Sequence, residues 1–360
     1  MNPRERILTT LNRRKPDHIP LVLTDMNREA YRHFLKTTGY QDLYSFFGAE
    51  QNIEYIEFYP TRLPLERFIP FHPHSFKPGT YTLNEWGTAF VEGSNPAFDH
   101  FVAPMIRATS VGDFASYPFP DLREEYRHHD LEKRVQAIHE KELAAVAFLE
   151  MTIFEVAWQI RGWEGLLLDF FDQEDIPTFL LDRITELRCF QVKRFAEAGV
   201  DVIRLGDDVG TQTKLMLSPT LYQKWLKPRL ARVISSARSI KPDVLISYHS
   251  DGYVEPLISD FIEAGIDVLN PVQPECMDPA RLKRIYGDRL AFWGTIGIQK
   301  TLPFGTPDDV RQEVKTRIET VGFNGGLVLS PTHLIEPEVP LENLIALVEA
   351  AKKYGGLVKE

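Results

Sequence analysis

Residues 244–294, VLISYHSDGYVEPLISDFIEAGIDVLNPVQPECMDPARLKRIYGDRLAFWG, contain three short apolar runs separated by two segments of helical period. The runs are Val244–His249, Ile266–Asn270 and Leu290–Gly294, and the helical segments are Val254–Ala264 and Asp278–Tyr286. Each run has the length of a strand, and each helical segment places apolar residues three and four positions apart. Strands that alternate with helices in this way lie parallel, because a parallel pair needs a crossover connection.

The same alternation of strand and helix extends over most of the chain. Repetition of the unit in the second half favours a closed barrel over an open sheet. The runs with the composition of buried parallel strands are Ile19–Thr24, Ile53–Tyr59, Ala144–Glu150, Val200–Gly206, Val244–His249, Ile266–Asn270, Leu290–Gly294 and Leu327–Ser330. The sequence therefore predicts an α/β fold, a single (β/α)8 TIM barrel that spans residues 1–360.

Residues 60–143 depart from this regular pattern. They contain proline-rich and aromatic-rich stretches, and a hairpin is expected around Tyr81–Phe90. Loops of this length in a compact domain are usually functional or have structure of their own. We expect an insertion that caps the mouth of the barrel, and the alternative is a separate small domain.

The composition argues against several classes of partner. The chain has 360 residues and a formal net charge of −10, whereas binding to nucleic acid or to anionic lipid requires clustered positive charge. It has no apolar run long enough to span a membrane, and its N-terminal segment carries charges where a secretory signal is apolar. Its two cysteines, Cys189 and Cys276, lack the spacing of a disulfide framework. These features predict a cytoplasmic protein.

Ionisable side chains gather where the predicted strands end, and in a barrel the loops after the strands build the active site. His249 and Asp251 are separated by one residue at such an end, so that both side chains face the same way and can share one ion. His333, after the last strand, is the expected third ligand. Two imidazoles and a carboxylate suit Zn²⁺, with Fe²⁺ as the alternative. Otherwise the histidines only form hydrogen bonds and Asp251 caps a helix.

A second group of carboxylates follows two neighbouring strands. Asp207 and Asp208 come shortly after Arg204, and Glu155 begins a helix after the third strand. Because one carboxylate raises the pKa of another, we expect Asp207, Asp208 or Glu155 to act as a general acid or base. The alternatives are an ion pair of Arg204 with either aspartate, and stabilisation of Glu155 by the dipole of its helix.

Other polar and aromatic residues near the strand ends are expected to bind substrate. They are Arg204, Tyr248, Asn270, Gln273 and Trp158. Cys276 is a further metal ligand if its thiolate faces the site, and otherwise a packed side chain.

Several stretches of the chain resemble the uroporphyrinogen decarboxylase superfamily. They are MNPRERILTTLNRRKPDHIPLVL, LGDDVGTQTKLMLSPTLYQKWLKP, the long stretch from YHSDGYVEPL to FGTPDDV, and GGLVLSPTHLIEPEVPLENL. The likeness covers nearly the whole chain and implies a (β/α)8 barrel. The superfamily includes porphyrinogen decarboxylases that use no cofactor and zinc-dependent methyltransferases that work with corrinoid proteins or coenzyme M.

The resemblance is nearer to the methyltransferases. The decarboxylases bind substrate carboxylates through a segment of the form RQAGR, whereas the matching stretch here has one arginine, Arg28. The methyltransferases hold zinc through an H-x-C pair and a later cysteine, and these positions are His249, Asp251 and His333 in this chain. Harder ligands thus replace both thiolates, and a zinc with less thiolate charge is a stronger Lewis acid.

The resemblance implies a metal-dependent methyltransferase that passes a methyl group from a small methylated substrate, such as a methyl ether, to a corrinoid protein. Its cofactors are Zn²⁺ and the corrinoid of its partner, and such barrels also form homodimers. The alternative enzyme is a metal-free decarboxylase or lyase that acts on a carboxylic acid with His333, Asp207 and Asp208.

Overall fold

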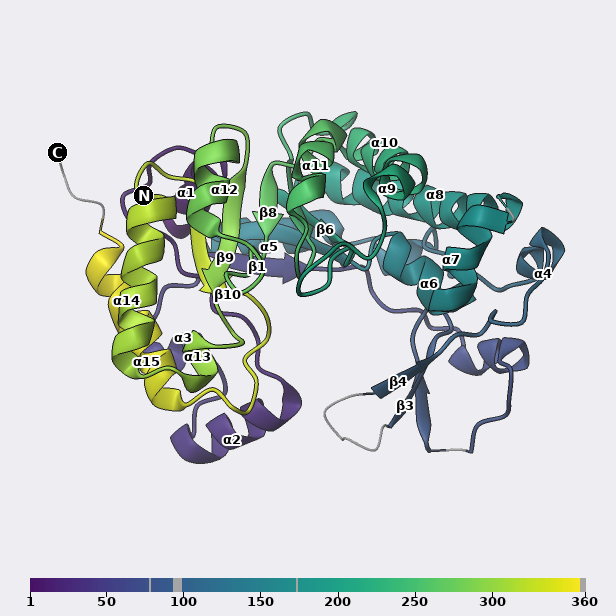
Figure 1. Ribbon diagram of the computed structural model, residues 1–360, viewed down its shortest axis with the longest axis horizontal. Coiled ribbons are helices and arrows are strands. Elements are labelled where there is room, and N and C mark those ends of the chain that lie inside the picture. The colour runs from purple at the N-terminus through teal and green to yellow at the C-terminus, as the bar shows by residue number, and fades with distance from the viewer. Residues whose placement is uncertain (78, 93–98, 173, 357–360) are drawn as a thin grey trace.

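The computed structural model describes residues 1–77, 79–92, 99–172 and 174–356, and its main feature is a curled parallel sheet (Figure 1). Within these residues the sheet has seven strands in the order β1-β5-β6-β7-β8-β9-β10. They are β1 (Ile53–Ile56), β5 (Ala144–Glu150), β6 (Val202–Gly206), β7 (Leu245–His249), β8 (Val268–Asn270), β9 (Ala291–Ile296) and β10 (Leu327–Pro331). Each overlaps a predicted strand, and the barrel-like α/β architecture is confirmed.

The first predicted strand, Ile19–Thr24, contributes one parallel bridge, between Leu21 and Leu329. Leu329 N donates to Pro20 O at 2.9 Å, but Pro20 has no N–H of its own to extend a ladder. On the other side, the Asn52 side chain next to β1 donates to Leu21 O at 3.1 Å. In the described residues, seven strands and this bridged segment therefore surround the axis of the barrel.

Helices cover the outside of the sheet (Figure 1). The helix α10, for example, buries Leu230, Val233 and Ala237 along one face, as its apolar spacing requires. The helices are α1 (Pro3–Leu11), α2 (Arg28–Thr38), α3 (Leu43–Phe47), α4 (Val111–Ala115), α5 (Leu131–Glu140), α6 (Phe154–Arg161), α7 (Trp163–Asp172), α8 (Asp175–Glu197), α9 (Pro219–Trp225), α10 (Lys227–Arg238), α11 (Ile258–Ala264), α12 (Pro279–Tyr286), α13 (Thr301–Phe304), α14 (Pro307–Arg317) and α15 (Leu341–Tyr354), with the 3-10 turns η1 (Leu65–Phe71), η2 (Glu125–Arg127) and η3 (Glu255–Leu257) and the π-helical turn η4 (Ile318–Gly322). None of them, over the described ranges, is both long and apolar enough to cross a membrane.

The inside of the barrel is apolar at the amino ends of its strands. Val146, Val202 and Val328 face inward and pack with Ile7 and Leu11 of α1. All five side chains are fully buried. The helix α1 therefore closes this end of the barrel, and a site for a polar ligand has to lie at the other end.

The insertion contains a small antiparallel sheet of β2 (Tyr81–Leu83), β3 (Ala89–Glu92) and β4 (Asp99–Val102). The strands β2 and β3 form the hairpin predicted around Tyr81–Phe90. Figure 1 shows β3 and β4 on the same side of the molecule as α6, and the Asn84 side chain of the hairpin donates to Gln159 of α6 at 3.2 Å. The insertion thus flanks the carboxyl end of β5.

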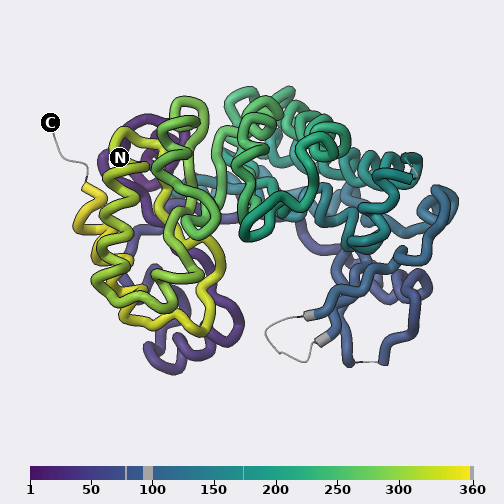
Figure 2. Tube along the Cα trace, in the orientation of Figure 1, coloured from purple at the N-terminus to yellow at the C-terminus, as the bar shows by residue number. Residues whose placement is uncertain are grey.

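The N-terminus and the last described residues, which end at Gly356, lie on one side of the molecule (Figure 2). Near them, Ile19 N donates to Gly355 O at 2.9 Å, and His18 forms an antiparallel bridge with Gly356. The segment after α15 is thereby joined to the segment that precedes the barrel, which brings the first and last parts of the sequence together.

Candidate metal and substrate site

The ends of four neighbouring strands lie level with one another. In the register of the sheet, Glu150 pairs with Gly206, and Gly206 pairs with His249. His249 in turn pairs with Asn270. Residues at one level of a parallel barrel point to the same side, here into the barrel at its carboxyl end. Gly206 makes room for this, because a Cβ atom at this position would lie 2.7 Å from His249 Cβ.

Asp208, His249 and Asp251 each bring one atom that can bind a metal, and these atoms lie within 4.8 Å of one another. His249 Nε2 is 3.8 Å from Asp251 Oδ1, and His333 Nε2 is 4.0 Å from Asp251 Oδ2. The three ligands expected from the sequence are therefore neighbours, with Asp251 between the two imidazoles. Asp208, which we expected in catalysis, lies with them.

The orientation of His249 is determined by Asn270. The Asn270 amide donates through Nδ2 to Trp293 O at 3.0 Å, which turns its oxygen toward the His249 ring. His249 Nδ1 lies 2.6 Å from this Oδ1. Because an amide oxygen only accepts, Nδ1 donates to it, and this orientation turns Nε2 toward Asp251.

The group of donors fits a divalent cation. Asp251 Oδ1 is buried and has no hydrogen-bond partner among the described residues, a costly state that a cation would relieve. The 3.8 Å between Asp251 Oδ1 and His249 Nε2 is too long for a hydrogen bond. One zinc ion with bonds of about 2.1 Å to each ligand can reach both atoms across this distance. Imidazole and carboxylate ligands of this kind suit Zn²⁺ or Fe²⁺.

Arg204 lies inside the barrel, one layer below the candidate metal ligands. Its Nε donates to Glu150, one terminal nitrogen donates to Tyr55 Oη at 3.1 Å, and the other donates to Asn270 Oδ1 at 2.9 Å. Burial raises the pKa of Glu150, but His249 and Arg204 outweigh this effect and hold that pKa below its usual value. The centre of the barrel therefore contains a hydrogen-bonded pair of opposite charges.

Asp207 is a helix cap. Its carboxylate accepts hydrogen bonds from Ile153 N at 3.0 Å and from Glu155 N at 2.9 Å, at the start of α6. Burial raises the pKa of Asp207 to about 7, against the effect of these backbone donors. The ion pair of Arg204 that we considered for the aspartates is formed with Glu150 instead, because Arg204 and Asp207 point to different sides of their segment.

Glu155, in the first turn of α6, lies beside Asp208, which follows β6. Its carboxyl oxygen accepts a hydrogen bond from Asp208 N at 3.1 Å. Burial, followed by the negative charges of Asp208 and Asp207, raises the pKa of Glu155 to about 9. The raised pKa favours the protonated form of this carboxyl group, which is the form that acts as a general acid.

Tyr248 and Trp158, which were expected to bind substrate, each pack against another aromatic side chain. Tyr248 points out of the barrel and packs against Phe261 of α11, with ring centroids 5.0 Å apart. The structure therefore does not bring Tyr248 together with the other candidate residues. Trp158 is half-buried on α6, and its ring centroid lies 5.7 Å from that of Phe101 on the insertion.

Gln273 and Cys276 lie in the loop after β8. Gln273 is buried and its Oε1 accepts a hydrogen bond from Gly252 N, so that it holds the residue after Asp251 in place. Cys276 Sγ donates to Gln212 Oε1 at 3.2 Å. This thiol is not among the donors that group around Asp251, and burial raises its pKa, which disfavours the thiolate that a metal would need.

Glu150 and Tyr55 were missed among the residues of the site. Glu150 is the last residue of β5, and in the sequence it ends an apolar run as His249 does. That signal would have selected Glu150. Tyr55 has no such signal, because the sequence of a four-residue strand does not show whether an aromatic side chain in it faces into the barrel or toward the helices.

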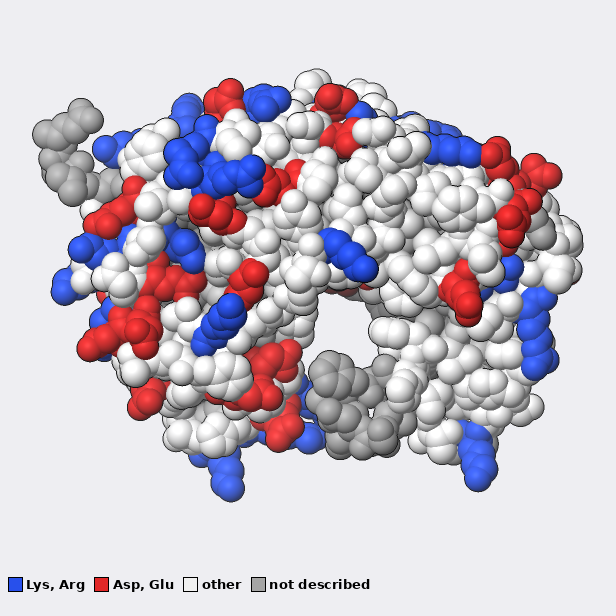
Figure 3. Space-filling view, in the orientation of Figure 1, with Lys and Arg blue, Asp and Glu red and all other residues white. Residues whose placement is uncertain are grey.

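A cavity of about 440 Å³ extends into the barrel from these strand ends. Its walls include His249 and His333 at the mouth and Arg204, Phe148 and Trp293 deeper in the barrel. Figure 3 shows that the surface is also hollowed between the barrel and the insertion. The candidate ligands therefore adjoin a space large enough for a small organic molecule.

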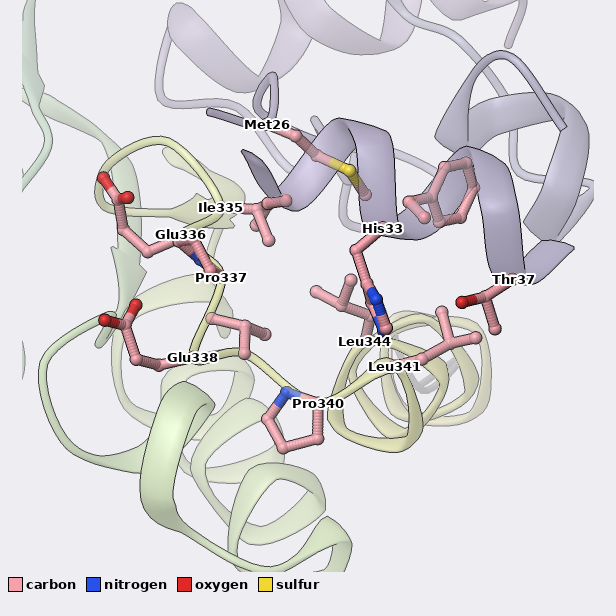
Figure 4. Close-up of a pocket in the computed structure, with 13 residues that line it drawn as sticks. Met26, His33, Thr37, Ile335, Glu336, Pro337, Glu338, Pro340, Leu341 and Leu344 are labelled. Atoms are coloured by element: carbon pink, nitrogen blue, oxygen red, sulfur yellow. The ribbon is translucent and has the colours of Figure 1, made fainter. Parts of the chain in front are cut away.

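A second, smaller cavity of about 130 Å³ lies between α2 and the segment that leads into α15 (Figure 4). Met26, Ile335 and Leu344 supply apolar walls, and His33 comes from α2. Its loop, residues 335–340, directly follows His333. The cavity thus adjoins the loop of a candidate ligand but is lined by other residues.

Comparisons with known proteins agree with this architecture. The sequence profile described as "Uroporphyrinogen decarboxylase (URO-D)" matches residues 89–354. A methylcobamide:CoM methyltransferase MtaA of Methanosarcina barkeri is 33% identical over 193 residues, which are 53% of this chain and 51% of that protein. The chain thus spans about half the length of this relative. A uroporphyrinogen decarboxylase of Alkalilimnicola ehrlichii is 23% identical over 96% of this chain and 93% of that protein.

Among solved structures, a methyltransferase from Methanosarcina mazei has a similar fold, with a TM-score of 0.69 and 20% sequence identity. The match covers 98% of this chain and 99% of that one. The likeness therefore extends over the whole barrel and its insertion.

Proposed function

The chain belongs to the uroporphyrinogen decarboxylase family, and on this premise we propose that it is a metal-dependent methyltransferase that moves a methyl group from a small methylated substrate to a corrinoid protein. The observation that carries the proposal is the group Asp208, His249 and Asp251. In it, a buried oxygen of Asp251 has no hydrogen-bond partner among the described residues and lies near Nε2 of His249. The 33% identity to a methylcobamide:CoM methyltransferase supports the reaction class.

In this proposal His249 and Asp251 hold the metal, and Asp208 and His333 are the further ligands. A bound zinc ion supplies a Lewis acid that polarises the oxygen or nitrogen carrying the methyl group. Asn270 keeps the His249 ring in the tautomer and orientation that binding requires. The chain's part in catalysis would thus be to hold the metal with these four side chains and to orient the substrate heteroatom toward it.

Glu155 is the proton source. A methyl group that passes to the corrinoid would leave the bonding electron pair on the substrate heteroatom, which would then need one proton. Glu155 is placed to give this proton because burial raises its pKa and so favours its protonated form. Asp208 lies between Glu155 and Asp251 and connects the proton donor with the ligands.

The alternative is a metal-free carboxy-lyase. Relatives named uroporphyrinogen decarboxylase, one of them aligned over 96% of this chain, favour it. Such an enzyme needs a cation for the substrate carboxylate. Arg204 is the guanidinium inside the barrel, but Glu150 already pairs with it, which weighs against this function.

Elemental analysis of protein purified without chelator tests the proposal. We expect about one zinc or iron per chain, a stoichiometry set by a single group of ligands. His249→Ala and Asp251→Ala should lose this metal, whereas His129→Ala, which removes an exposed histidine, should retain it. Metal-free protein, or metal that persists in His249→Ala, would leave the carboxy-lyase as the better account.

A further inference from the structure

The cavity inside the barrel is the space that the body of a metal-bound substrate has to enter. It has a volume of about 440 Å³ and is bounded at its mouth by His249 and His333. On its opposite wall lie Tyr55, Phe148 and Trp293. A small molecule whose heteroatom approaches His249 therefore places the rest of its atoms against these residues and Arg204.

Arg204 has the only permanently cationic side chain among the described residues that line this cavity. Its three nitrogens already donate to Glu150, to Tyr55 Oη and to Asn270 Oδ1. The guanidinium also lies 5.4 Å from the ring centroid of Trp293, so that part of its surface is covered. An incoming anion would have to share the charge of this guanidinium with Glu150.

The remaining charges of the cavity are negative. Asp25, Glu54 and Glu150 line it. Lys141, which does not line the cavity, pairs with Glu54 at 2.8 Å, and Arg204 pairs with Glu150. Asp25 is a further negative charge. A sulfonate or carboxylate in this space would meet like charges at short range, where the protein interior screens them less than water does.

The aromatic walls favour the opposite kind of ligand. Tyr55 is 42% exposed, and its ring stands edge-on to that of Phe148 with centroids 5.4 Å apart. Such surfaces attract apolar groups and, through the electron density of their ring faces, organic cations. The Arg204 guanidinium already lies 5.9 Å from the ring centroid of Tyr55 and 6.0 Å from that of Phe148, so a ligand cation has to reach the parts of these rings that Arg204 leaves open. The accessible part of the cavity thus combines aromatic faces with carboxylates.

We infer that this cavity binds a substrate body without negative charge, neutral or ammonium-bearing, and excludes sulfonates and carboxylates. The inference rests on the proposed function, since it places the substrate beside the metal. It distinguishes this chain from a methyltransferase whose substrate is the anion coenzyme M, because the charge selection follows from the engaged state of Arg204.

Three thiols of equal length test the inference. They are 2-mercaptoethanesulfonate, 2-mercaptoethanol and 2-aminoethanethiol, which are anionic, neutral and cationic at the end remote from sulfur. Binding to protein loaded with Co²⁺ is followed by the sulfur-to-cobalt absorption band, and each affinity is corrected for the fraction of thiolate. We expect the neutral and cationic thiols to bind at least about tenfold more tightly than the sulfonate. Equal or tighter binding of the sulfonate overturns the inference.

The variant Glu150→Gln tests whether the pairing of Arg204 with Glu150 causes the exclusion of anions. It keeps the size of the side chain but removes the charge that engages Arg204, so that binding of the sulfonate should improve about tenfold while that of 2-mercaptoethanol stays within about twofold. Glu57→Gln, which changes a carboxylate just beyond β1 that does not line the cavity, is the matched control. If Glu150→Gln leaves the ranking of the three thiols unchanged, the engaged Arg204 does not set the selectivity.

Failure of the metal site is distinguishable from failure of the inference. Protein that takes up no Co²⁺ contradicts the proposed function, and the ranking is then read from the S-methyl derivatives of the three thiols by ligand-observed NMR on metal-free protein. The same order of affinities supports the charge selection by itself, and the reverse order refutes it. Bound Co²⁺ whose spectrum none of the thiols changes also refutes the inference, because the cavity then does not adjoin the metal.

Discussion

At the residue scale, the geometry of His249 depends on one amide. Asn270 receives the Nδ1 proton of His249 and is itself oriented by Trp293 O. Outer hydrogen bonds of this kind usually contribute about 10–100-fold to metal affinity. We predict that Asn270→Ala lowers the affinity for Zn²⁺ by this factor, measured by competition with a chromophoric chelator.

The exposed Asn12→Ala is the control for this change. An affinity that stays the same in Asn270→Ala, while His249→Ala abolishes binding, would mean that the ring is held by another neighbour, such as Glu150, whose Oε1 lies 3.5 Å from Nδ1.

A substitution at Asp207 distinguishes a structural role of this residue from a catalytic one. Because its carboxylate accepts backbone N–H groups at the start of α6, we predict that Asp207→Ala lowers the free energy of unfolding by about 2 kcal/mol. The urea midpoint measures this, with Asp288→Ala, an exposed carboxylate, as the control. Full stability together with lost activity would instead assign Asp207 to the chemistry.

Lys283 on α12 provides a pH-dependent prediction. It is 6% exposed, and burial, followed by the charge of Arg13, lowers its pKa to about 8. An unfolded lysine titrates near pH 10.4, so that between about 8 and about 10.4 the unfolded state binds more protons and the stability from this residue rises with pH. We therefore predict that Lys283→Met loses about 2 kcal/mol of stability relative to the unaltered chain across this window.

Urea unfolding at several pH values measures this difference. The exposed Lys36→Met should show a constant difference from the unaltered chain over the same range. A constant difference for Lys283→Met as well would mean that Lys283 titrates at its ordinary pKa in the folded protein.

At the scale of elements, the close approach of β9 to Pro271, the residue after β8, depends on a glycine. Gly294 has φ of +125°, and a Cβ atom there would lie 1.9 Å from Pro271 O. Both the left-handed backbone and the clash oppose any other residue. We predict that Gly294→Ala costs more than about 2 kcal/mol, measured by thermal unfolding. Gly356→Ala, where nothing lies within 4 Å of the added atom, should change little.

The elements also show how far the sequence reaches. The strands were predicted because apolar runs of strand length alternate with helical periods, and this is a local property. The segment Ile19–Thr24 has the same composition but contributes one bridge, because Pro20 lacks a donor. Tyr248 looked like a site residue by its position beside His249, yet the alternation of side chains along β7 turns it away from the barrel.

At the scale of the whole molecule, the insertion is joined to the barrel through α6. Gln159 receives hydrogen bonds from Asn84 and from Thr88 at 3.2 Å each, and Met105 N donates to Ile160 O at 2.9 Å. We propose that residues 1–360 are accordingly one domain, with 60–143 as its insertion. We predict a single unfolding transition in urea, with coincident curves from tryptophan fluorescence and far-UV circular dichroism. Two separated transitions would indicate that the insertion folds independently.

By itself, the sequence determined the alternation of strands and helices, and with it the end of the barrel where His249, Asp251 and His333 lie. These properties follow from periodicity along the chain, which decides the side of a strand that each residue faces. Only the tertiary structure decided that Arg204 pairs with Glu150, that Asp207 caps α6 and that Asp208 lies beside Asp251. Such pairings depend on the register between strands that are distant in sequence, and no local pattern specifies that register.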